Sequence, residues 1–265
     1  MGIFSVKQHW IILVIYFLTN VSANADFLRP DSLSEDQPAE HYLSSQILTT
    51  FMQVEGEVAQ HEINEQLSEL NTFIEQLQRK RGKYRSERRF LSYFFYKVHR
   101  QFLKRYQAHT TLYDLLENGN YDCVTGSALY ALLLDALDIP YQVHEFPYHV
   151  YLTVTTADRN TIMIESTDPQ YGFVVDTTEQ AKRYQHYSQV NGTDDTESYY
   201  QYDFTIQATI GLKELAGLSY FNEAVEHYNK QEFQQARQLL RQANKLYTSP
   251  RTEAFKTLMT SVSQK

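Results

Sequence analysis

The sequence predicts an α+β protein in which helical N-terminal and C-terminal regions flank a small antiparallel sheet. Apolar residues recur at three- and four-residue spacing over residues 41–106 and again from about Phe204. Between these regions lie short segments in which apolar and polar residues alternate. With 265 residues, 42% of them hydrophobic, the chain is long enough for one sizeable domain and a small appendage.

The first 25 residues are typical of a secretory signal peptide. Lys7 precedes an apolar run over residues 10–18, which is shorter than the roughly 20 residues that a membrane-spanning helix needs. Small residues near the end of the segment predict cleavage after Ala23 or Ala25. We therefore expect an exported protein, periplasmic or secreted, with no stable membrane insertion after cleavage. An uncleaved amphipathic anchor is the alternative.

Residues 26–106 are expected to form a helical N-terminal region after a polar lead-in over residues 26–40. Within it, the stretch 79–105 carries eleven Lys and Arg residues against one acid, Glu87, although the net charge of the chain is −8. We expect a basic helical arm that packs against an acidic remainder. The alternative is a surface that binds anionic lipid, glycan or nucleic acid. No nucleic-acid motif accompanies it, so we expect no nucleic-acid partner.

Residues 107–203 are expected to form the core. Residues 123–137 are apolar around nearly the whole circumference of a helix, which predicts a buried helix with Asp122 as its N-cap. Strands are predicted to follow, and then an irregular, tyrosine-rich surface segment over residues 176–201. The predicted strands cover residues 141–146, 149–155 and 161–165, with residues 171–175 as a candidate fourth.

Residues 204–265 are expected to form a helical C-terminal region. Within it, residues 220–250 resemble one tetratricopeptide unit, a helical hairpin with small and bulky residues at fixed spacing. The positions that carry this resemblance are Ala224, Tyr228, Phe233, Ala236, Leu240, Ala243 and Pro250. One such unit cannot bury its own apolar face, so we expect it to pack onto the rest of the chain.

The single cysteine, Cys123, cannot form an internal disulfide. A lone thiol in an oxidising compartment is prone to oxidation, so it is either buried and inert or retained for its chemistry. A helix N-terminus supplies partial positive charge and unpaired amides, which favour a thiolate. Asp122 opposes this effect if its carboxylate faces the sulfur, and does not if it caps the helix.

The order of Cys123, His149 and Glu165 suggests a nucleophile, a base and an orienting acid. If the two strands are adjacent and antiparallel, His149 and Glu165 can lie side by side, so that the carboxylate fixes the imidazole tautomer. The backbone amide of Cys123 would be the oxyanion donor. Asp168 is an alternative orienting acid and His144 an alternative base.

Residues 120–168 resemble the core of the transglutaminase-like superfamily. The matches are Cys123 at the start of a helix, His149 in His-Val-Tyr-Leu-Thr-Val and Glu165 in Glu-Ser-Thr. The tail over residues 210–250 is similar to the repeat that follows this core in some bacterial members. The resemblance implies a papain-like α+β fold, with these three residues as the catalytic set. The sequence departs from the family pattern at Glu165, where Asp is more usual, and at Tyr151, where Trp is frequent.

These features predict an exported thiol enzyme that transfers an acyl group through a Cys123 thioester. We expect a protein or peptide substrate and hydrolysis rather than cross-linking, because water is the default acceptor. The alternative is a non-catalytic binding module that uses the tyrosine-rich segment 184–202 and the basic arm. No cofactor and no metal site are predicted, since the nine His residues show no ligand spacing and no phosphate-binding glycine loop is present.

Overall fold

The computed structural model describes residues 43, 45–54, 56–189 and 206–262. The predicted signal peptide, residues 1–25, lies outside this part of the chain. The described residues belong to one compact unit that begins at His41. Within them, no helix combines the length and the apolar character that crossing a bilayer requires.

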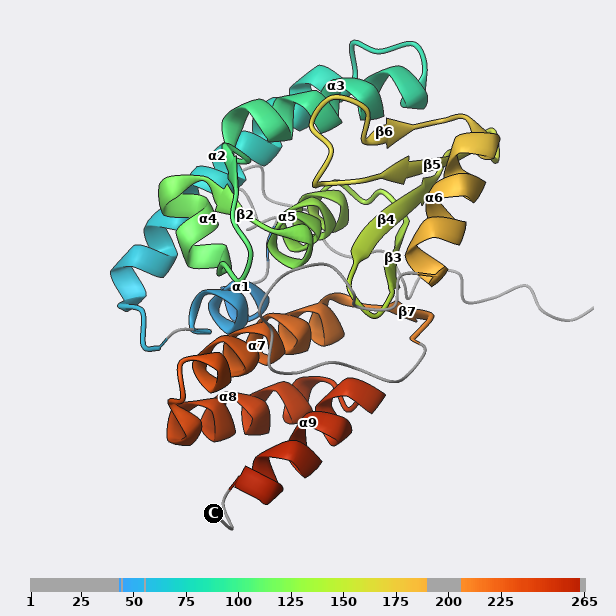
Figure 1. Cartoon of the computed structure of the whole chain (residues 1–265). Coiled ribbons are helices and arrows are strands. Elements are labelled where there is room, and N and C mark those ends of the chain that lie inside the picture. The colour runs from blue at the N-terminus through green and yellow to red at the C-terminus, as the bar shows by residue number, and fades with distance from the viewer. Residues whose placement is uncertain (1–42, 44, 55, 190–205, 263–265) are drawn as a thin grey trace, which may run out of the picture. The chain divides into compact units, whose positions relative to one another are not determined.

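Helices and strands alternate irregularly along the described chain, as expected for an α+β protein (Figure 1). The helices are α1 Ser45–Met52, α2 Gln60–Arg81, α3 Glu87–Gln101, α4 Leu112–Asn118, α5 Cys123–Ala136, α6 Thr177–Gln189, α7 Leu212–Asn229, α8 Phe233–Leu246 and α9 Pro250–Val262. The strands are β1 Arg105–Tyr106, β2 Asn120–Tyr121, β3 Tyr141–Glu145, β4 Val150–Thr155, β5 Thr161–Ile164, β6 Phe173–Val174 and β7 Ala208–Ile210.

The main sheet has the strand order β6-β5-β4-β3-β7, and every neighbouring pair is antiparallel. The candidate fourth strand is present as β6. The prediction of helix from about Phe204 was wrong for the first residues, because β7 pairs with the edge of β3 through Ile210 opposite Val143. Pairing satisfies backbone groups at the β3 edge that would otherwise lack partners. Helix begins only at Leu212.

The prediction of an irregular segment over residues 176–201 was also wrong in its first half, where α6 forms. No residue of α6 is fully buried, so its sequence lacks the apolar stripe on which the helix prediction depends. Figure 1 shows α6 along one face of the sheet and α5 against the other. Residues 190–201 lie outside the described residues.

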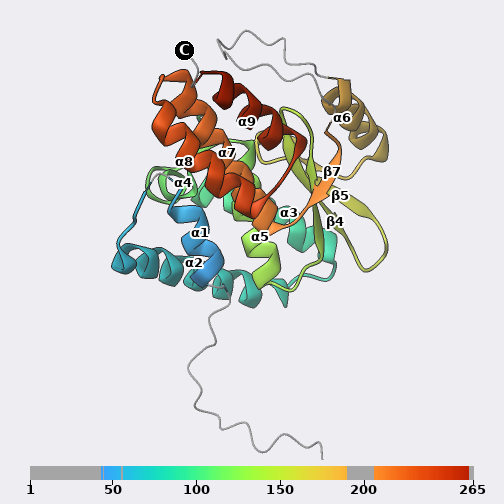
Figure 2. The same ribbon diagram turned by 90° about the horizontal axis from the view of Figure 1, so that it is seen from below.

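Helix α5 lies at the centre of the described chain, between the sheet and the helices α1 and α2 (Figures 1 and 2). Its side chains are buried almost without exception from Val124 to Ala136, as its sequence predicts. The phenol of Tyr130 donates a 2.8 Å hydrogen bond to the backbone oxygen of Phe95 on α3. The central helix is therefore fixed by packing on all sides, and Cys123 stands at its first residue.

The C-terminal helices α7 and α8 form a hairpin, and α9 packs against it (Figure 1). The expected docking is confirmed, since α7 packs against α5 and α1. A buried ion pair ties this region to β3, with 2.7 Å between Arg251 Nη2 and Glu145 Oε1 and exposed fractions of 8% and 0%. Tyr247 donates to the other Glu145 oxygen at 2.6 Å, and Arg251 to the backbone oxygen of Phe146 at 2.9 Å.

We predict that Arg251→Met lowers the free energy of unfolding by about 3–5 kcal/mol, because it leaves the Glu145 carboxylate buried without its cation. Urea unfolding of the full chain measures the change. Arg79→Met is the matched control, since it removes an Arg–Glu pair whose side chains are 66% and 40% exposed. It should cost less than about 1 kcal/mol. Equal losses in both variants would contradict the prediction.

Candidate active site

Cys123 is half-buried at the first position of α5, and Asp122 is confirmed as the N-cap. Asp122 Oδ1 accepts hydrogen bonds from the Thr125 amide at 2.8 Å and from the Thr125 hydroxyl at 2.9 Å. The Asp122 amide donates in return to Thr125 Oγ1 at 2.9 Å. Burial raises the pKa of Asp122, and the hydrogen bonds from Thr125 oppose that rise. The carboxylate is thus engaged with the helix amides, which resolves the ambiguity in favour of capping.

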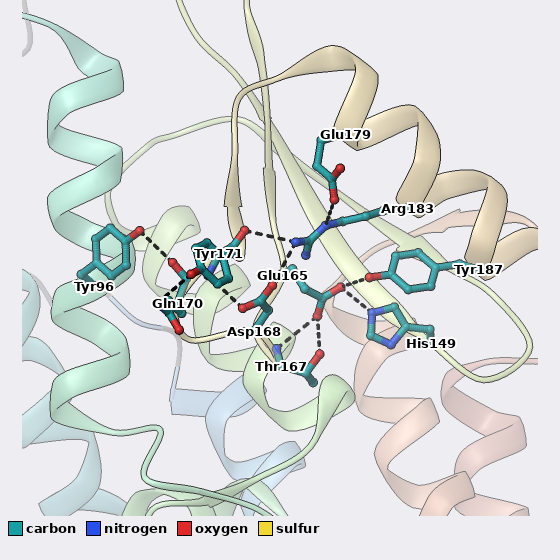
Figure 3. Close-up of polar contacts among 10 residues, drawn as sticks. All are labelled: Tyr96, His149, Glu165, Thr167, Asp168, Gln170, Tyr171, Glu179, Arg183 and Tyr187. Atoms are coloured by element: carbon teal, nitrogen blue, oxygen red, sulfur yellow. Dashed lines mark hydrogen bonds and ion pairs between the residues drawn. The ribbon is translucent and has the colours of Figure 1, made fainter. Parts of the chain in front are cut away.

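The structure brings His149 and Glu165 together at the ends of adjacent antiparallel strands. His149 directly precedes β4 and Glu165 directly follows β5, and His149 Nε2 lies 2.5 Å from Glu165 Oε2 (Figure 3). Because Nε2 is bonded to Glu165, Nδ1 is the ring nitrogen left for the thiol. Burial alone lowers the pKa of His149, but the neighbouring Cys123 thiol and the hydrogen-bonded Glu165 carboxylate outweigh it and raise the pKa to about 10. The three predicted side chains therefore converge.

The carboxylate of Glu165 is 1% exposed and accepts hydrogen bonds on both oxygens. Oε1 accepts from the Thr167 amide at 3.1 Å and from the Thr167 hydroxyl at 2.6 Å. Oε2 accepts from Tyr187 at 2.8 Å in addition to His149. Burial raises the pKa of Glu165, yet the bonds from His149 and Thr167 lower it below its ordinary value. The acid stays ionised and is fixed in orientation.

Tyr187 is a site residue that the sequence reasoning missed. It lies on α6, and its ring centroid is 4.2 Å from that of His149, with an interplanar angle of 35°. Burial and the neighbouring Glu165 raise the pKa of Tyr187, so the phenol remains protonated as a donor. The available signal was the spacing of Arg183 and Tyr187, which are four residues apart and therefore share one helix face.

The two alternative residues are engaged elsewhere. Asp168 accepts from Arg183 Nη2 at 2.9 Å and from the Tyr171 amide at 2.8 Å (Figure 3). His144 Nε2 lies 2.8 Å from the Thr153 hydroxyl, and its ring stacks on that of Tyr151. Among the described residues, Glu165 is thus the acid bonded to an imidazole at this site, and His149 provides that imidazole.

Two glycines allow the close approaches that position the acid. A Cβ at Gly172 would lie 2.2 Å from the Glu165 backbone oxygen, and the Gly172 oxygen accepts from the Glu165 amide at 2.8 Å. A Cβ at Gly126 would lie 2.8 Å from both side-chain atoms of Ser166. Gly126 therefore lets the first turn of α5 approach the chain just after Glu165, which brings the helix carrying the thiol close to the acid.

An exposed tyrosine lies near the start of α5. Tyr106 on β1 is 57% exposed, and its ring meets that of Tyr121 edge-on at 6.1 Å. The parallel pairing of β1 with β2, which the sequence analysis did not predict, holds this side chain next to the start of α5.

Comparisons of the chain with protein-family models, with curated proteins and with solved structures find no match. Within the described residues, no group of three or more His, Cys, Asp and Glu side chains is arranged to hold a metal ion.

The raised pKa of His149 predicts a stability that depends on pH. Between its ordinary value of 6.5 and its folded value of about 10, the folded protein holds this proton more tightly than the unfolded chain does. The stabilisation is complete below about pH 6.5 and is lost as the pH rises toward 10. We therefore expect the advantage in thermal midpoint of the wild type over His149→Gln to shrink between pH 6.5 and 10.

The control is His144→Gln, because burial shifts the pKa of His144 in the opposite direction, below its ordinary value. The advantage in thermal midpoint of the wild type over this variant should therefore not shrink as the pH rises. An advantage over His149→Gln that also fails to shrink would contradict the prediction.

Proposed function

We propose that this protein is an exported thiol enzyme of the transglutaminase-like superfamily, with a papain-like core, that transfers an acyl group through a Cys123 thioester. The observation that carries the proposal is the His149 imidazole, which bonds to the buried Glu165 carboxylate and whose pKa the neighbouring Cys123 thiol raises. The order of a helix that begins with Cys, a strand preceded by His and a strand followed by an acid supports the superfamily assignment. Export rests on the sequence of residues 1–25.

Because the pKa of His149 is raised to about 10, its ring carries a proton at neutral pH. In the first half-reaction, the Cys123 sulfur, as a thiolate beside this imidazolium, attacks a substrate carbonyl carbon. The carbonyl electron pair moves to its oxygen, which the Cys123 amide can stabilise, since the first amides of a helix have no intrahelical acceptor. The intermediate then expels the amine, which receives the proton from Nδ1. A thioester on Cys123 remains.

In the second half-reaction, a water gives a proton to Nδ1 and attacks the thioester carbon. The new intermediate expels the sulfur as a thiolate and releases a carboxylic acid, which restores the resting pair of thiolate and imidazolium. Glu165 stays ionised throughout and stabilises the imidazolium. We favour hydrolysis of a peptide or amide over cross-linking because cross-linking needs a bound amine in place of water.

The first test is the alkylation rate of Cys123 by iodoacetamide at pH 7, which reports on one site because the chain has one cysteine. We expect His149→Ala to slow alkylation by about tenfold or more, because the imidazole no longer takes the proton. His144→Ala, a histidine bonded to Thr153 on the neighbouring strand, should leave the rate unchanged. Equal rates in all three proteins would remove the support for an activated thiol.

The second test separates an enzyme from a binding module that keeps the same fold. With p-nitrophenyl acetate we expect a burst of p-nitrophenol equal to one per chain, and intact-mass spectrometry should show one acetyl group, lost in Cys123→Ala. Adding an amine such as glycinamide shows whether the acyl group passes to water or to the amine. A wild type that gives no burst and no acetyl adduct favours the binding module.

A further inference from the structure

A groove of about 420 Å³ lies between α8 and α9, at the C-terminal end of the described chain. Its floor includes Leu240 and Met259, both buried, and its walls carry polar and cationic side chains. Its lining residues are Arg237, Leu240, Arg241, Asn244, Lys245, Thr252, Lys256, Met259 and Thr260. Four of these are cations and none is an acid, which is unexpected in a chain with a net charge of −8.

The cations of α8 form one row. Arg237, Arg241 and Lys245 are spaced four residues apart, so they lie on one face over about 12 Å at 1.5 Å per residue. Like charges at this spacing repel and destabilise a helix. Within the described chain, neither arginine is paired with a carboxylate, whereas Lys256 of α9 lies 3.7 Å from Glu253. The repulsion along the row is therefore largely uncompensated.

Arg237 adds a second, independent observation. Its side chain is only half-buried, yet its Nε is fully enclosed and has no hydrogen-bond acceptor among the described residues. A buried donor without an acceptor costs free energy, and an incoming anion would remove that cost. Guanidinium groups bind carboxylates through two parallel hydrogen bonds, which suits two arginines one turn apart.

We propose that this groove binds an acidic peptide segment of a protein partner, with carboxylates on the row Arg237, Arg241 and Lys245 and apolar side chains on Leu240 and Met259. The groove is concave, so a peptide can reach the apolar floor, whereas a flat lipid surface would meet only the exposed ends of the cations. Asn244 and Thr252 supply polar groups for the peptide backbone. This inference does not depend on the reactivity of Cys123.

The test is fluorescence anisotropy of a labelled 12-residue peptide in which Glu alternates with Leu, titrated with the full chain at 50 mM salt. We expect Arg237→Gln/Arg241→Gln to weaken binding at least tenfold. The matched control is Arg88→Gln/Arg89→Gln, which makes the same charge change on exposed residues of α3 and should stay within twofold of the wild type. If the double variant melts earlier than the wild type, Arg241→Gln/Lys245→Gln replaces it.

Binding should also weaken in 300 mM salt and should be absent for the same peptide with Lys in place of Glu. Equal losses in the two double variants would overturn the proposal, because binding would then follow net charge alone. Binding of phosphatidylglycerol vesicles, but not of the peptide, would assign the groove to a membrane instead. A dimer of the wild type that the groove variants abolish would assign it to a second copy of the chain.

Discussion

The ionised Glu165 carboxylate is the group on which the site depends, because a charge with 1% exposure persists only where donors replace water. Those donors come from three separate places: His149 before β4, Thr167 in the following turn and Tyr187 on α6. Losing Thr167 would leave Oε1 without a donor, and losing His149 or Tyr187 would remove one of the two donors to Oε2. The requirement to satisfy this one buried acid therefore holds together segments that are up to 38 positions apart in the sequence, from 149 to 187.

The sheet explains how one acid can meet partners from both of its faces. Val150, Leu152 and Val154 belong to the main core beside α5, whereas Tyr151 and Met163 belong to a smaller apolar cluster beside Tyr187 of α6. His149 and Glu165 lie just beyond the ends of these strands, where both helices can reach them. The nucleophile thus comes from the helix on one face and the tyrosine from the helix on the other. The extra methylene of Glu, compared with Asp, lengthens the reach of the acid from its strand.

The sequence was sufficient to predict an element where its local pattern of apolar residues matches the burial of those residues in the fold. The all-round apolar character of residues 123–137 predicted a buried helix, and the alternation around His149 predicted β4. The sequence analysis missed helix α6 because this helix has no apolar stripe. Tyr187 contributes to the site through one hydrogen bond and one ring contact, and neither contact requires such a stripe. Strand β7 was missed because three residues carry too little periodicity, and its pairing with β3 is a tertiary effect. The residues next to Gly126 in the sequence do not predict its close approach to Ser166, because that contact is formed only in the tertiary structure.

Charged side chains occur in two different settings in this chain, as buried ion pairs and as the row of cations on α8. Two buried carboxylates are paired with cationic side chains at short range, Glu145 with Arg251 and Glu165 with His149. Such pairs offset the cost of desolvation only when their geometry is good, so they are fixed features of the fold. The row on α8 is different, because its arginines stand beside an apolar floor and pair with no acid among the residues that the structure describes. A cation row of this kind adds nothing to folding and is consistent with a surface whose compensating charge belongs to a separate molecule.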